Sequence, residues 1–60
     1  MTLVTITNGK MSRKEYKTQM NMHKAQDKAI KAKATFIGKI YDDGSEYIYN
    51  TRTGLFVRTK

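Results

Sequence analysis

Residues 12–33, with the sequence SRKEYKTQMNMHKAQDKAIKAK, decide the expected fold of this 60-residue chain. Neither Pro nor Gly interrupts them, and the good helix formers Ala, Lys, Met and Gln dominate. Ser12 lies three residues before Glu15, which is the spacing of a capping box, and Met11 and Tyr16 hold the two positions of a hydrophobic staple. The stretch therefore predicts one long helix over residues 12–33.

The N-terminal residues predict a strand. Residues 2–7 alternate Thr with Leu, Val and Ile, and β-branched residues favour extended backbone. Asn8-Gly9 is a strong hairpin signal. Because a helix cap follows it, however, we interpret it as a tight turn between a strand and the helix. The alternative is a short hairpin that runs to Met11.

The C-terminal residues predict a three-stranded antiparallel meander with strands at 35–41, 46–50 and 55–59. Asp43-Gly44 separates two strongly β-forming runs and predicts a two-residue turn, and residues 51–54 predict a four-residue loop. We therefore expect a single α+β domain of 1–60, ordered β-α-β-β-β. Its one long helix would pack on a sheet of three or four antiparallel strands, with residues 2–7 as the fourth.

A two-residue turn would pair Ile40 with Tyr47 and Gly38 with Tyr49, leaving room for the Tyr49 ring across the glycine. This register separates an aliphatic face from an aromatic one. The aliphatic face carries Ile37, Ile48, Leu55 and Val57; the aromatic face carries Phe36, Ile40, Tyr47, Tyr49 and Phe56. We expect the helix to cover the aliphatic face. The opposite packing would turn the aliphatic face towards solvent or a second subunit, and an exposed patch of either kind indicates an interface.

The chain is strongly basic, with 12 Lys and Arg against 5 Asp and Glu and a formal net charge of +7. Residues 9–33 hold eight of the basic residues and only two acidic ones. On the predicted helix five cations share one side, whereas a merely solvated face more often interleaves Glu with Lys. These five are Arg13, Lys17, Lys24, Lys28 and Lys31. A field of this sign attracts nucleic acid or an acidic protein surface.

The sequence contains few residues that could act in catalysis. It contains one His and no Cys, so no nucleophile–base set can be assembled, and we expect neither an enzyme nor a cofactor or metal. His23 is interpreted as a packed histidine. The absence of Cys fits a reducing compartment, and we expect a cytoplasmic protein. The N-terminus resembles neither a signal peptide nor a membrane span. The apolar side of the helix carries Ala, His and Asp rather than Trp, Phe and Leu, which argues against membrane insertion.

The leading hypothesis is a small nucleic-acid-binding protein of low sequence specificity, with RNA or single-stranded DNA slightly favoured because aromatic rings can stack on bases. The residues expected to contact nucleic acid are Lys10, Arg13, Lys14, Lys17, Lys24, Lys28, Lys31, Tyr47, Tyr49, Arg52, Phe56 and Arg58. The alternative is a protein-interaction module or small inhibitor that binds an acidic surface of a larger protein, such as a nucleic-acid-processing enzyme. A homodimer is compatible with either hypothesis.

Overall fold

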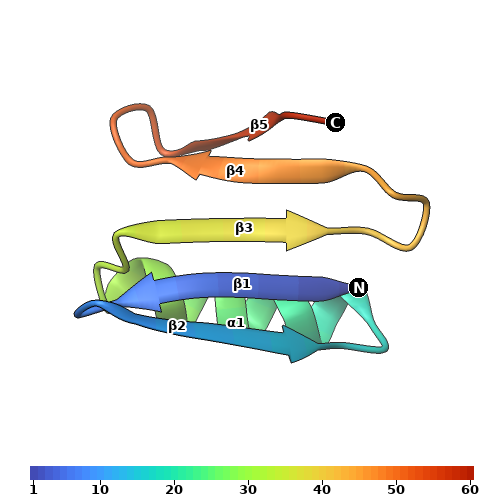
Figure 1. Ribbon diagram of the computed structural model, residues 1–60, viewed down its shortest axis with the longest axis horizontal. Helices are drawn as coiled ribbons and strands as arrows, with labels where there is room; N and C mark the ends of the chain where they lie inside the picture. Colours follow the sequence, from blue (N-terminus) through green and yellow to red (C-terminus); the bar gives the residue numbers. More distant parts are fainter.

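Five strands form one antiparallel sheet, and a single helix packs on it, so the predicted α+β class is confirmed. The computed structural model describes all 60 residues. In chain order the elements are β1 (Thr2–Thr7), β2 (Lys10–Glu15), α1 (Gln19–Lys31), β3 (Phe36–Ile40), β4 (Glu46–Asn50) and β5 (Leu55–Arg58). Across the sheet the strand order is β2-β1-β3-β4-β5, as Figure 1 shows.

The helix covers only part of the sheet. It contacts β1 and β3, whereas β4 and β5 have no helix behind them in the view of Figure 1. Between helix and sheet lies a core of four buried hydrophobic residues, Leu3, Met22, Ala34 and Ile37. The other side of the sheet, called the open face below, carries no helix at all.

The largest departure from the expected fold is the strand β2, because residues 10–15 do not belong to the helix. Asn8 and Gly9 have φ angles of 53° and 78°, which form a two-residue hairpin turn between the paired residues Thr7 and Lys10. The predicted strand-to-helix turn and the order β-α-β-β-β are therefore wrong. The hairpin considered as the alternative is present, and it extends to Glu15.

Pairing with β1 explains why this segment is extended despite its helix-forming residues. The ladder of hydrogen bonds to β1 satisfies the backbone groups on the inner side of β2, and tertiary pairing of this kind outweighs a weak local propensity. Glu15 does not close a capping box. Instead its Oε1 accepts a hydrogen bond of 2.5 Å from the Thr2 hydroxyl, directly across the strand pair.

The helix begins at Gln19 and ends in a well-formed cap. Thr18 is the N-cap, and its hydroxyl accepts from the backbone N–H of Asn21 at 3.2 Å. At the other end, the N–H of Lys33 donates to the carbonyl of Ile30 and the N–H of Ala34 to that of Ala29, both at 3.1 Å. This is the Schellman pattern, and it places Lys33 at a φ of 58°, in the left-handed region.

The first hairpin of the meander has a three-residue loop rather than the predicted two-residue turn. Tyr41 pairs with Ser45: the Tyr41 N–H donates to the Ser45 carbonyl at 2.9 Å, and the Gly44 N–H donates to the Tyr41 carbonyl at 3.0 Å. Gly44 has a φ of 87°, as the last position of such loops requires. The extra residue shifts the register by one, so that Ile40 pairs with Glu46.

This shift exchanges the predicted faces of β4 and β5 relative to β3. Tyr47, Tyr49 and Phe56 lie on the helix side of the sheet, so the expectation of an exposed aromatic face is wrong. The open face carries the aliphatic residues of β4 and β5. It also carries Phe36, whose ring lies over Gly38 where Tyr49 was expected: a Cβ at Gly38 would be 3.0 Å from Phe36 Cε2. The predicted pairing of β4 with β5 is confirmed.

The cap geometry predicts that Lys33→Gly stabilises the protein. A non-glycine residue in the left-handed region costs about 1 kcal/mol, which glycine avoids. We expect the free energy of unfolding to rise by about that amount and the Tm by about 4–8 °C, as measured by circular dichroism. Lys31→Gly is the matched control, because it places glycine inside the helix and should destabilise the protein. A loss of stability in Lys33→Gly would contradict this assignment of the cap.

Candidate functional site

The basic residues between positions 10 and 33 have no internal ion pairs. The ion pairs in the structure join the N-terminal ammonium to Glu15 and Asp42, at 3.9 and 2.7 Å, and Lys60 Nζ to Glu46 at 3.6 Å. All eight basic side chains of this segment are exposed: Lys10, Arg13, Lys14, Lys17, Lys24, Lys28, Lys31 and Lys33. Their charge is therefore presented to solvent without local compensation.

Five of these lysines gather on β2 and α1 and form what we call the cationic face. Lys24, Lys28 and Lys31 are spaced four and three residues apart in α1, so they share one side of the helix. Lys14 lies opposite the core residue Leu3, which places it on the helix side of β2, and alternation along the strand puts Lys10 on the same side.

A shallow groove of about 190 Å³ runs between the two elements of the cationic face. Lys14 lines it from β2 and Lys28 from α1. Between them Ala25, Ala29 and Ala32 form an apolar wall, and no acidic side chain lines the groove. Two features therefore favour anion binding here. Lysines converge on the groove from two elements, and the small alanines allow an extended anion to approach them.

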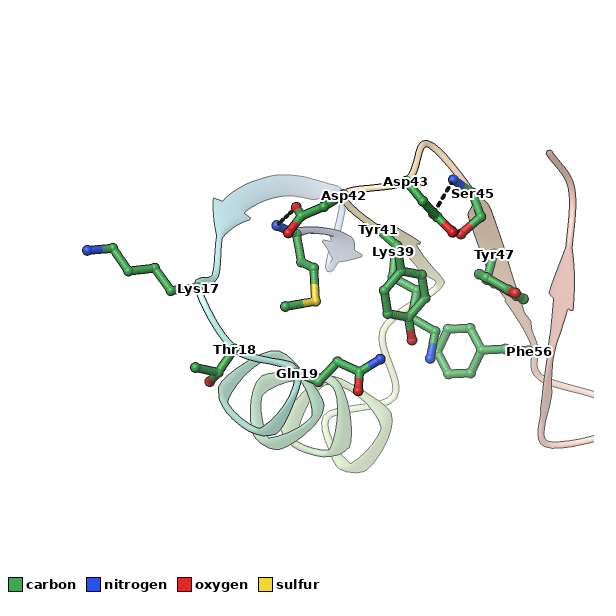
Figure 2. Close-up of a pocket in the computed structure, with 11 residues that line it drawn as sticks. Lys17, Thr18, Gln19, Lys39, Tyr41, Asp42, Asp43, Ser45, Tyr47 and Phe56 are labelled. Atoms are coloured by element: carbon green, nitrogen blue, oxygen red, sulfur yellow. Dashed lines mark hydrogen bonds and ion pairs between the residues drawn. The ribbon is translucent and has the colours of Figure 1, made fainter.

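The predicted stripe of five cations along one helix is not present in that form. Arg13 and Lys17 both precede the helix. Arg13 lies opposite Val4, on the open face of the sheet, and Lys17 points away from the helix in Figure 2. Lys10 and Lys14, which were expected to contact nucleic acid but were not part of the stripe, join Lys24, Lys28 and Lys31 from β2.

Arg52 and Arg58 lie far from the cationic face across the sheet. Arg52 is exposed in the loop between β4 and β5, and Arg58 ends β5, the strand at the opposite edge from β2. The Arg58 Nε donates to the carbonyl of Lys60 at 3.0 Å. The structure therefore does not bring these two predicted site residues together with the lysines of α1.

Two of the predicted aromatic residues, Tyr47 and Phe56, instead surround a buried lysine together with Tyr41, as Figure 2 shows. Lys39 is only 8% exposed, and its Nζ lies 4.0 Å from the ring centroid of Phe56, 5.5 Å from that of Tyr41 and 5.8 Å from that of Tyr47. Its single hydrogen bond goes to Gln26 Oε1 in α1, at 3.2 Å. Ring faces attract a cation, so this arrangement offsets the cost of burying the ammonium group.

Sequence reasoning missed Lys39 as a central residue. The predicted two-residue turn put Ile40 rather than Lys39 opposite Tyr47, so Lys39 was not expected beside the aromatic rings. The signal that could have revealed it is the loop length, since a three-residue loop pairs Lys39 with Tyr47 directly. The remaining predicted aromatic, Tyr49, packs on Phe56 with ring centroids 5.1 Å apart.

The groove drawn in Figure 2 lies on the other side of α1 from the cationic face. It has a volume of about 860 Å³, and its lining joins the start of α1 to β3, β4 and the loop between them. Its rim is mixed in charge, because Lys17 stands on one side and Asp42 and Asp43 on the other. It lacks the uniform positive lining of the groove between β2 and α1.

On this rim the pKa of Asp43 is lowered from its ordinary value, chiefly by the hydrogen bond from the Ser45 hydroxyl and then by that from the Ser45 N–H. The two bonds are 2.6 and 2.9 Å long. Because they favour the charged carboxylate, they stabilise the fold above the unfolded-state pKa, and this contribution is lost as the pH falls through the folded-state pKa.

We therefore predict that Ser45→Ala raises the pKa of Asp43 towards its ordinary value. The change removes the stronger of the two hydrogen bonds and leaves the backbone donor in place. The measurement is an NMR titration of the Asp43 carboxyl carbon from acid to neutral pH. Ser12→Ala, a serine change in β2, is the control and should leave the titration unmoved. An unchanged Asp43 titration in Ser45→Ala would contradict the assigned cause.

The structure contains no group of three or more His, Asp and Glu side chains that could hold a metal ion. His23 is half-buried in α1, and its Nε2 is buried without a hydrogen-bond partner. The helix α1 is not long and apolar enough to cross a membrane.

Comparison with known proteins found no matching family model, no matching curated protein and no matching solved structure.

Proposed function

We propose that the protein binds nucleic acid through the phosphate backbone, using the cationic face. The observation that carries the proposal is the convergence of exposed lysines without ion pairs from β2 and α1 on a groove with no acidic lining. Phosphates contacted by these ammonium groups release their condensed counterions, which supplies binding free energy independent of sequence.

Nothing on the cationic face is suited to distinguish one base from another. The groove is lined by Lys, Ala, Thr and Ser with Leu3 and Tyr16, and it carries no Arg, Asn or Gln, whose planar groups bond to base edges in a fixed bidentate geometry. Tyr47, Tyr49 and Phe56 lie on the far side of α1 from the groove, where they contact Lys39 or the core. The proposed contacts are therefore to phosphates, with low sequence specificity and without dependence on base stacking.

The first test of this proposal is a charge reversal on both elements of the face, Lys14→Glu with Lys24→Glu and Lys28→Glu. We expect Kd to rise by about 100-fold or more, because three phosphate contacts become repulsive. Fluorescence anisotropy with labelled single-stranded RNA, single-stranded DNA and duplex DNA measures this. The matched control reverses Lys17, Arg52 and Arg58, which lie off the face and change the net charge by the same amount.

Equal losses in the two triple variants would show a general charge effect and contradict the cationic face. Circular dichroism on each variant establishes that the fold is kept. Capture of a protein from lysate that survives nuclease treatment, together with no binding to any labelled nucleic acid, would assign the face to an acidic protein surface instead.

The second test is the dependence of binding on salt. With about five phosphate contacts, the slope of log K against log salt for duplex DNA should be about −4 to −5. In the Lys14/Lys24/Lys28 variant the slope should be smaller in magnitude by about three. Anisotropy titrations at several NaCl concentrations give both values. A slope near zero for the unmodified protein would exclude phosphate contacts as the source of affinity.

A further inference from the structure

The open face presents an apolar surface that spans the whole sheet. The strand registers place Met11, Ile6 and Phe36 side by side across β2, β1 and β3, and place Ile48 beside Val57 across β4 and β5. Several of these side chains are well exposed: Met11 is 70% accessible and Val57 50%, and Ile48 and Leu55 are exposed as well. Exposed aliphatic side chains gathered on one face mark an interaction surface.

The middle of this face is hollowed. Beside the Phe36 ring, which occupies the space over Gly38, Val4, Met11, Ile40 and Ile48 line a mainly apolar depression of about 260 Å³. The depression can receive a large apolar side chain from a surface laid against it. It therefore provides the shape complementarity that a flat sheet face would lack.

The chain has little other means of stabilising its fold. It has no disulfide, and its four buried hydrophobic residues are fewer than its five exposed large ones. In addition, β4 and β5 have no helix on either face. A 60-residue domain with so small a core usually gains stability from a metal, a disulfide or association. Association through the open face would bury the aliphatic side chains that the fold leaves exposed.

We infer that the open face is the interface between two copies of this chain, which pack sheet against sheet. Viewed onto the sheet as in Figure 1, the molecule extends about 28 × 20 Å, so full overlap of two copies would bury roughly 1,000 Å², near the lower bound for a specific interface. Interfaces of this size are typical of weak, reversible association. Identical twisted sheets pack face to face at about −30° in sandwich folds, so a second copy is a suitable occupant.

Charge favours a second copy over a charged partner. The open face is nearly neutral although the chain carries +7, because its ionised side chains are Arg13, Glu15 and Glu46, the last paired with Lys60. Two copies can therefore approach through this face while their cationic faces point outwards.

The decisive experiment is sedimentation equilibrium of the full chain from 1 µM to 1 mM. We expect the mass to rise with concentration from 6.9 kDa towards twice that value. Met11→Lys and Val57→Lys should each weaken the dimer at least tenfold. Met20→Lys is the matched control, because Met20 is 69% exposed on α1 and should leave the dimer intact. A monomer at every concentration, or equal weakening by Met20→Lys, would overturn the inference.

A second measurement covers the case in which these variants unfold. In the unmodified protein, dilution should shift the methyl NMR signals of Met11, Ile48 and Val57 but not that of Met20. Shifts that are absent, or that spread over α1, would refute the open face as the interface.

Discussion

The three-residue loop between Tyr41 and Ser45 fixes which side of the sheet each later residue faces. Its geometry depends on Gly44 in the left-handed region and on the Asp43 carboxylate, which accepts two hydrogen bonds from Ser45. A loop one residue shorter would turn every side chain of β4 and β5 to the opposite face. Because of this loop, Lys39 faces Tyr47, and the aliphatic residues of β4 lie exposed on the open face.

Lys39 then serves in place of a larger apolar core at the β4–β5 end of the sheet. Its ammonium group bonds to Gln26 of α1, and the rings of Tyr41, Tyr47 and Phe56 surround it. Together with Tyr49 and Phe56, which pack against the core, this side chain connects the helix to strands that it does not cover. A buried ammonium group without a carboxylate partner is costly, so the ring faces and the amide oxygen are both needed to hold it.

The same fold separates the two kinds of exposed surface. Lysines without ion pairs gather on β2 and one side of α1, whereas the exposed aliphatic residues of the sheet lie on the face without a helix. Repulsion between neighbouring lysines opposes folding slightly, so an anionic partner would relieve it. Lysines on the edge strand β2 also discourage pairing of that edge with another chain. If the two proposals hold together, the dimer carries a cationic face on each of its outer surfaces.

The sequence by itself determined much of the architecture. Alternation identified β1, the four-residue loop gave the register of β4 with β5, and the charge count located the basic region in residues 9–33. These features are local, because each depends on residues close together in the chain. The cationic face was predicted only in part: Lys24, Lys28 and Lys31 share one side of the helix as expected, whereas Lys10 and Lys14 reach it from a strand.

Tertiary structure alone decided the rest. Residues 10–15 carry a capping-box spacing and helix-forming side chains, yet they form a strand, because pairing with β1 bonds the backbone groups on the inner side of β2 and also covers the free edge of β1. The face of the sheet that α1 covers depended on one residue of loop length, which changes every contact of β4 and β5 but leaves their sequence pattern the same. Local propensity and periodicity describe each segment separately, and neither identifies the part of the chain against which that segment packs.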